Sequence, residues 1–204
     1  MKNLTNSITR FLLGLKRPSS STNKRLLHKN GETLSSFIIR EAVTKDIEDL
    51  VTLHIQVWYE TYGNSKHKLS RDYIHRFWKE AFERTNEGWF CFVIENTHTH
   101  QLVGYAKAKP YASGDLPDYA GELNKIYLLR NYQRLGLGAK LVGHVARRFL
   151  SQGIHTMVLF GIPQNPSCGF HEAMGGRRLY SANGKFHGGY GWLDLQKLAE
   201  RTPV

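Results

Sequence analysis

The stretch from Tyr132 to Ala139 carries two closely spaced glycines, Gly136 and Gly138, between a predicted strand and a predicted helix. Glycine lets the backbone curl around a ligand that side chains would block. The N-terminus of a helix also exposes N–H groups without partners and a partial positive charge, which together can hold a pyrophosphate. Gln133 and Arg134 can add hydrogen-bond donors. The turn therefore predicts a site for a ligand that carries phosphate.

Three other interpretations of this turn compete with that one. A junction between a strand and a helix often contains glycine without any ligand. A nucleotide loop of the Walker type needs lysine and then serine or threonine after its last glycine, whereas Ala139 and Lys140 follow Gly138. A dinucleotide fingerprint needs a third glycine where Leu141 stands. The last two observations argue against an NTPase and against a dinucleotide-binding enzyme.

A second block, from Asn165 to Gly176, reads Asn-Pro-Ser-Cys-Gly-Phe-His-Glu-Ala-Met-Gly-Gly. It resembles the segment Asn-Pro-x-x-x-Phe-Tyr-Glu-x-x-Gly-Gly of the GNAT superfamily of N-acetyltransferases. The glycine turn is similar to that superfamily's acetyl-CoA signature. It has the spacing Gln-x-x-Gly-x-Gly and follows a predicted strand that contains Glu122 to Leu128. The segment from His54 to Tyr62 resembles its first helix on the acceptor side. The resemblance extends from about Phe37 to Leu198.

The resemblance implies an enzyme that uses acetyl-CoA as co-substrate and acetylates a primary amine of a small molecule or a protein. The amine would attack the thioester directly while both substrates are bound. The backbone of Ile126 and Leu128, on either side of Tyr127, would pair with the pantetheine amides. Asn165 and Phe170 would line the other side of the cofactor. The residues implied to hold the pyrophosphate are Gln133, Arg134, Leu135, Gly136, Leu137, Gly138 and Ala139.

Two residues are candidates for proton transfer. Glu122 opens the strand that enters the predicted cofactor site, so its carboxylate could deprotonate the amine directly or through water, or could simply pair with a lysine. His171 stands where the family usually has the tyrosine that protonates the leaving thiolate. A histidine can donate a proton near neutral pH, but it could equally pack against the cofactor in an inactive relative. A non-catalytic acyl-CoA sensor is therefore the alternative function.

Candidates for acceptor contact come from the first helix and from a loop. Tyr62 lies at the end of the first helix beside Gly63, and we expect it to contact the acceptor, whereas we expect Trp58 to belong to the core. Asp115 and Asp118 lie in a predicted loop from Pro110 to Ala120 and could attract a cationic acceptor.

These residues need a scaffold, and hydrophobic periodicity predicts a mixed α/β sheet flanked by helices. The strand from Glu122, the helix after the glycine turn and the next strand form a predicted βαβ unit. The predicted strands are Phe37 to Arg40, Trp89 to Glu95, Leu102 to Ala108, Glu122 to Leu129, Met157 to Gly161, Arg177 to Tyr180 and Tyr190 to Leu195. One predicted helix begins at Thr44 to Asp46. The other predicted helices span Arg71 to Arg84, Leu137 to Leu150 and Cys168 to Met174.

The basic charge is concentrated at the start of the chain. The formal net charge is +11, and residues 1–36 contribute seven Lys or Arg against Glu32 alone, so 7 − 1 = +6. This composition predicts a disordered extension over residues 1–36, with a targeting peptide as the alternative, and one N-acetyltransferase domain over residues 37–204. The charge also leaves nucleic-acid binding by the extension as a rival function. No motif that recognises RNA or DNA supports it, and we expect no nucleic-acid partner.

The remaining composition bears on compartment and partners. The two cysteines, Cys91 and Cys168, form no disulfide framework and no metal-ligand spacing, which predicts no metal site and a reducing, cytoplasmic location. No apolar run approaches the roughly 18 residues of a membrane span, so we expect no membrane contact. Aromatic residues on the second helix and the last hairpin make a homodimer conceivable.

Overall fold

The computed structural model describes residues 32–63 and 69–202 of the 204-residue chain. Within these ranges the chain forms one seven-stranded sheet and five α-helices. The strands are β1 (Phe37–Glu41), β2 (Phe90–Asn96), β3 (Leu102–Pro110), β4 (Gly121–Leu128), β5 (Met157–Phe160), β6 (Arg177–Tyr180) and β7 (Phe186–Trp192). The helices are α1 (Ile47–Tyr62), α2 (Arg71–Glu83), α3 (Leu137–Ser151), α4 (Cys168–Ala173) and α5 (Leu195–Arg201).

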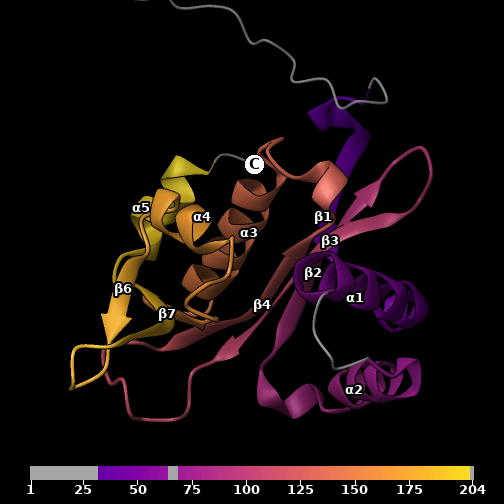
Figure 1. Ribbon diagram of the computed structural model, residues 1–204. Helices are drawn as coiled ribbons and strands as arrows, with labels where there is room; N and C mark the ends of the chain where they lie inside the picture. Colours follow the sequence, from indigo (N-terminus) through magenta and orange to yellow (C-terminus); the bar gives the residue numbers. More distant parts are fainter. Residues whose placement is uncertain (1–31, 64–68, 203–204) are drawn as a thin grey trace, which may run out of the picture.

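The strand order is β1-β2-β3-β4-β5-β7-β6, and all neighbours run antiparallel except the parallel pair β4 and β5. Helix α3 connects these two parallel strands, so the predicted βαβ unit is confirmed. Figure 1 shows α1 and α2 on one face of the sheet and α3 with α5 on the other. The predicted class, a mixed sheet flanked by helices, is confirmed.

Helices α1 and α2 cover the first face because each has one apolar stripe. Leu50, Leu53 and Val57 are buried at spacings of three and four residues along α1. On α2, Ile74 and Trp78 are buried four residues apart, and Ser70 caps the helix by accepting a hydrogen bond from the N–H of Tyr73. The two stripes meet the sheet and bury the aromatic face of β3.

Helix α3 covers the opposite face through a run of fully buried positions. Its buried side chains include Leu141, Val142, Val145 and Phe149. The Phe149 ring packs edge-on against Phe90 of β2 at a centroid distance of 5.1 Å. The core is therefore built on both faces of the sheet, and the ends of its strands are left to form the site.

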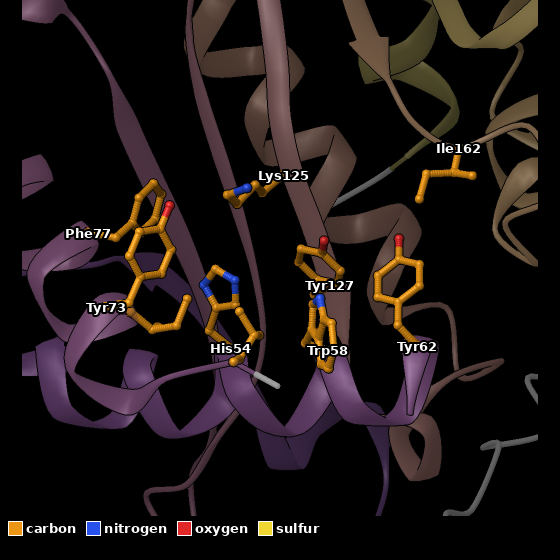
Figure 2. A pocket seen from close by; sticks show the side chains of 10 residues that line it. His54, Trp58, Tyr62, Tyr73, Phe77, Lys125, Tyr127 and Ile162 are labelled. Atoms are coloured by element: carbon orange, nitrogen blue, oxygen red, sulfur yellow. The ribbon is translucent and has the colours of Figure 1, made fainter. Parts of the chain in front are cut away.

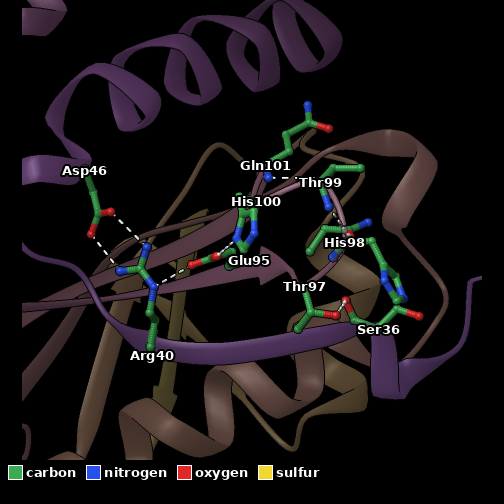
Figure 3. Close-up of polar contacts among 10 residues, drawn as sticks. Ser36, Arg40, Asp46, Glu95, Thr97, His98, Thr99, His100 and Gln101 are labelled. Atoms are coloured by element: carbon green, nitrogen blue, oxygen red, sulfur yellow. Dashed lines mark hydrogen bonds and ion pairs between the residues drawn. The ribbon is translucent and has the colours of Figure 1, made fainter.

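Arg40 ties the first strand to the first helix. Its guanidinium donates to both oxygens of Asp46, at 2.7 and 2.8 Å, and to Glu95 at 2.7 Å (Figure 3). Burial raises the pKa of Asp46, but the hydrogen bonds from Arg40 and from the N–H of Val43 outweigh it, so the pKa lies below its ordinary value. Asp46 precedes α1, so this pair fixes where the helix starts.

The packed part of the chain starts slightly before the predicted boundary at residue 37. Leu34–Ser36 form a 3-10 turn, and the Ser36 carbonyl accepts hydrogen bonds from the backbone and hydroxyl of Thr97 (Figure 3). The rest of the predicted extension, residues 1–31, lies outside the described residues. In the part of the chain that the structure covers, no helix is long and apolar enough to cross a membrane.

The C-terminal elements differ from the prediction. Strand β7 starts at Phe186 rather than Tyr190, because the turn between Ser181 and Lys185 is tight and the chain pairs again at once, Phe186 against Tyr180. The glycines of β7 are there for close packing: a Cβ on Gly191 would lie 2.1 Å from the hydroxyl of Tyr119. The sequence analysis also missed α5, which Asp194 caps through the N–H of Lys197.

Candidate functional site

The glycine turn forms the start of α3. Gly136 is the N-cap residue and has a left-handed backbone with φ of 86°, and Arg134 before it is also left-handed with φ of 66°. A Cβ on Gly136 would meet no atom within 4 Å, so the turn borders open space. The first N–H groups of α3 have no carbonyl partner within the helix. An anionic group can approach them from this open side.

The second glycine has a packing reason of its own. A Cβ on Gly138 would lie 3.3 Å from the ring of Phe170, so the glycine lets α4 pack against the first turn of α3. Gln133 also has an internal role, because its side-chain amide donates to the carbonyl of Leu128 at 2.9 Å. Gly136, in contrast, has a left-handed backbone and no packing contact at the position of a Cβ, so the packing of the described residues does not account for a glycine there.

Strands β4 and β5 separate beside this turn. They pair only at Gly121 with Met157 and at Glu122 with Val158, whereas the ladder from β4 to β3 continues to Leu128. Beyond Glu122, the edge of β4 that faces β5 has no strand partner among the residues that the structure describes. Such an edge can pair with the amides of an extended ligand. Ile126 and Leu128, which were predicted to do so, lie on this stretch.

A pocket of about 430 Å³ opens between α1, α2 and β4 (Figure 2). Figure 2 shows His54, Trp58 and Tyr62 side by side along successive turns of α1, pointing into it. The expectation that Trp58 belongs to the core is wrong, and Tyr62, for which contact with the acceptor was predicted, also lines the pocket. The lining residues are His54, Trp58, Tyr62, Leu69, Tyr73, Ile74, Phe77, Lys125, Tyr127 and Ile162.

One end of the pocket is connected to the predicted cofactor side. The amide of Asn165 donates to the hydroxyl of Tyr62 at 2.9 Å, and the carbonyl of the same side chain accepts from the N–H of Ser167 at 2.9 Å. Burial, together with the hydrogen bond to Tyr62, raises the pKa of Tyr127 to about 12. Asn165 thus joins the end of α1 to the loop after β5, where the strands part.

His54 contributes a neutral imidazole to the middle of the pocket. It is 6% exposed, and burial, with a smaller contribution from the charge of Lys125, lowers its pKa to about 4. Its ring stacks on Tyr127 at a centroid distance of 6.1 Å. At neutral pH this group carries no charge and can act as a hydrogen-bond acceptor.

A bulge in β4 decides which side chains reach the pocket. Lys107 of β3 pairs with Lys125, but the next residue, Ala108, pairs with Leu123, so Asn124 is an extra residue in the strand. Because of it, Glu122 and Lys125 lie on one face although they are three residues apart. Glu122 is held by Asn124 at 2.7 Å and by the ammonium of Lys109 at 3.4 Å. It lies on the pocket face of the sheet without lining the pocket.

His171 is buried rather than open to a cleft. It is 5% exposed, and its Nε2 lies 3.2 Å from the hydroxyl of Ser167. Its ring packs against Tyr190 at a centroid distance of 5.2 Å. Burial lowers its pKa to about 4, so the imidazole is neutral near pH 7. It holds no readily donated proton at that pH.

The two loop aspartates are not brought to the pocket. Asp115 accepts a hydrogen bond from the hydroxyl of Tyr111 at 2.5 Å on an exposed surface, and Asp118 is exposed in the same loop. Neither belongs to the residues that line the pocket.

Several residues that line the pocket were not predicted from the sequence. His54 was recoverable, because it precedes Trp58 by four residues and Tyr62 by eight, which places all three on one helix face. Lys125 was harder, since the bulge that turns it inward has no sequence signal of its own. Tyr73, Phe77 and Ile162 come from distant segments, and only the packing of α2 and of the loop after β5 joins them.

Comparison with known proteins gives a consistent result. The model of the acetyltransferase (GNAT) family matches residues 47–176. The uncharacterized N-acetyltransferase YuaI of Bacillus subtilis is 32% identical over 171 residues, which cover 78% of this chain and 95% of that protein. Phosphinothricin N-acetyltransferase of Streptomyces viridochromogenes is 32% identical over 123 residues, covering 58% of this chain and 63% of that protein.

Solved structures show the same fold. The PaiA N-acetyltransferase of Thermoplasma acidophilum, in complex with coenzyme A, has a TM-score of 0.57 at 20% identity and covers 76% of this chain and 98% of its own. The structure of the putative acetyltransferase YncA of Salmonella typhimurium with acetyl-CoA has a TM-score of 0.58 at 22% identity. The match covers 78% of this chain and 95% of that chain.

Proposed function

The chain belongs to the GNAT family of acetyltransferases, with acetyl-CoA as co-substrate, and we propose that its acceptor is the primary amine of a small molecule, which attacks the donor directly while both are bound. The observation that carries this proposal is the position of the pocket. Its residues Tyr127 and Ile162 belong to β4 and to the loop after β5, so the pocket opens where these two strands part. An acceptor there lies beside the edge that fits a pantetheine chain.

Two features of the chain fit acetyl-CoA. The open space at Gly136 admits a pyrophosphate to the N-terminus of α3, and the edge of β4 beyond Glu122 can pair with the pantetheine amides. The volume of about 430 Å³ supports a small acceptor, since it lies in the usual range for sites that enclose small molecules.

Bound acetyl-CoA supplies the acetyl group as a thioester. The amine nitrogen forms a bond to the carbonyl carbon, the bond from that carbon to sulfur breaks, and the amine loses a proton while the thiolate gains one. The residues of the pocket hold the amine at the end marked by Tyr62 and Tyr127. The hydroxyl of Tyr127, whose pKa burial raises to about 12, is uncharged near neutral pH and can donate a proton to the leaving thiolate.

We assign the base to Glu122, acting through water, because its carboxylate lies on the pocket face but does not line the cavity. We assign His171 to packing, because its imidazole is buried and neutral. Glu122→Gln should then lower kcat by roughly a hundredfold, whereas His171→Phe should leave kcat within about threefold of wild type. A large loss of kcat in His171→Phe with little change in Glu122→Gln would contradict both assignments.

The first test is calorimetric titration of acetyl-CoA into the wild type and a Gly136→Val variant. The matched control is Gly153→Val, because Gly153 also has a left-handed backbone, with φ of 75°, and also has no atom within 4 Å of a Cβ. The two variants carry similar backbone strain of about 1–3 kcal/mol, so only a site at Gly136 separates them. We expect at least about tenfold weaker binding for Gly136→Val alone. Equal binding by both variants would remove the turn from the site.

Turnover separates an enzyme from an acyl-CoA sensor. Release of free thiol from acetyl-CoA, followed with a panel of primary amines, is expected for the enzyme. Binding of acetyl-CoA without thiol release by any amine would favour the sensor. Dimerisation and the contribution of the basic segment stay predictions, which light scattering and removal of residues 1–31 can test.

A further inference from the structure

The pocket has a pronounced charge character. Among the lining residues that the structure describes, Lys125 is the one with a permanent charge, and no aspartate or glutamate joins it. His54, the other ionisable nitrogen base of the lining, is neutral near pH 7 because burial lowers its pKa. The pocket therefore presents a cation to whatever occupies it, which is the opposite of what a polycationic acceptor needs.

Lys125 forms no ion pair within residues 32–63 and 69–202. The acid nearest to it in the strand, Glu122, is paired with Lys109 and acts on Lys125 only through its more distant charge. The ammonium of Lys125 lies 5.5 Å from the ring centroid of Phe77, and that of its strand partner Lys107 lies 5.6 Å from the same ring. Two ammonium groups thus share one aromatic ring.

This arrangement is costly without a counter-ion. Burial lowers the pKa of Lys125, and the charge of Glu122 offsets part of this shift. Burial also lowers the pKa of Lys107, and like-charge repulsion from Lys109 and Lys125 lowers it further. The faces of Phe77 and, for Lys107, of Trp89 offset part of the cost through cation–π contact. An anion next to Lys125 would offset the rest and would be held in a largely desolvated place.

The walls of the pocket fit an apolar body. Trp58, Tyr73 and Phe77 contribute aromatic surface, and Ile74 and Ile162 contribute aliphatic surface. In Figure 2, Lys125 lies between the group formed by Tyr73 and Phe77 and the group formed by Tyr127 and Tyr62. An occupant can thus place its anion at Lys125, its apolar part along α2 and another group toward Tyr127.

We propose that the acceptor is an amine that carries its own carboxylate, namely an amino acid with an apolar or aromatic side chain, and that Lys125 binds this carboxylate. The inference rests on the proposed function and names its substrate class. The amino nitrogen lies toward Tyr62 and Tyr127, where it forms the bond to the acetyl carbon. The carboxylate takes no part in the bond changes, and the product is the N-acetyl amino acid with free coenzyme A. Polyamines and aminoglycosides are excluded by the same charge.

Matched pairs of acceptors test this proposal. Leucine, methionine, phenylalanine and tryptophan are each compared with the corresponding amine that lacks the carboxylate, both in thiol release and in calorimetric binding to the protein loaded with coenzyme A. We expect at least one amino acid to bind and react with kcat/KM at least about tenfold above its partner amine. Spermidine should be a poor acceptor.

The variant Lys125→Met keeps the length of the side chain and removes the charge. We expect it to lower kcat/KM for the best amino acid by about tenfold to a hundredfold, and by far less for the amine without a carboxylate, so that the preference for the amino acid collapses. The control is Lys79→Met, which removes the same charge from an exposed position of α2 and should preserve the preference.

Three results would overturn the proposal: equal use of both members of every pair, a preference that survives in Lys125→Met, or binding of none of the eight compounds to the loaded protein. Each is distinguishable from failure of the proposed function, which would appear earlier as an absence of acetyl-CoA binding by a folded wild type.

Discussion

The buried His171 should make the protein acid-sensitive by a calculable amount. Its pKa is about 4 in the folded chain against an ordinary value of 6.5, so the folded state resists protonation that the unfolded chain accepts. The contribution of the neutral imidazole is therefore fully present above pH 6.5 and is lost as the pH falls from there toward 4. At about pH 5 the loss is about 1.5 pH units times 1.36 kcal/mol, or about 2 kcal/mol.

The assay is urea unfolding followed by tryptophan fluorescence at about pH 7.5 and about pH 5, on the wild type and on His171→Phe. Phenylalanine keeps an aromatic ring against Tyr190 and does not titrate. Between the two pH values, the free energy of unfolding of the variant is expected to fall by about 2 kcal/mol less than that of the wild type. His54 has a similarly lowered pKa, but it is present in both proteins and cancels in the comparison.

Two outcomes would contradict this reasoning. If the free energies of unfolding of wild type and variant differ by the same amount at both pH values, His171 is not held as a neutral, buried imidazole. A larger acid loss in the variant would mean that the imidazole is stabilised as a cation by a group that the packing does not reveal.

Three further predictions concern the scaffold and the loop. Asp46→Asn should lower the free energy of unfolding by about 2–3 kcal/mol in urea at neutral pH, because Arg40 loses the carboxylate that accepts two of its hydrogen bonds. The difference in free energy between wild type and variant should shrink as the pH falls and the wild-type carboxyl is protonated. Gly191→Ala should lower the free energy of unfolding by about 1–2 kcal/mol through a clash with the Tyr119 ring, and Tyr119→Ala by a similar amount through loss of that ring. The double variant should cost less than the sum, because the added Cβ meets no clash once the ring is absent. Asp115→Asn should leave the acceptor KM unchanged in a thiol-release assay, since this carboxylate lies outside the pocket.

The elements that position the cofactor could be predicted because their signals are local. Helix α3 combines a regular apolar stripe with glycines at its start, and β4 and β5 are short apolar runs on either side of it. The hairpin of β2 and β3 follows from two β-rich runs joined by a polar turn. The same logic failed at the start of β7, where Gly188, which packs closely against the chain at Gly161, was left outside the predicted strand.

The pocket between α1, α2 and β4 could be predicted only in part, because it depends on how distant segments pack. Tyr62 was found from its place at the end of α1, but Trp58 was assigned to the core because helical spacing does not distinguish a core stripe from a pocket stripe. Asp115 was chosen for its charge, and the loop conformation turns it toward Tyr111. His171 was chosen from its place in a motif, and its burial depends on Tyr190 of another strand.

The bulge at Asn124 also bears on the gap between β4 and β5. Lys125 is paired with Lys107 and Leu123 with Ala108, so deletion of Asn124 would join two residues that already lie on opposite faces and would leave Lys125 and Tyr127 facing the pocket. The deletion would instead remove the local bend and twist that an extra residue gives a strand, two residues after the last pair between β4 and β5. The extra residue thus shapes the space between these two strands.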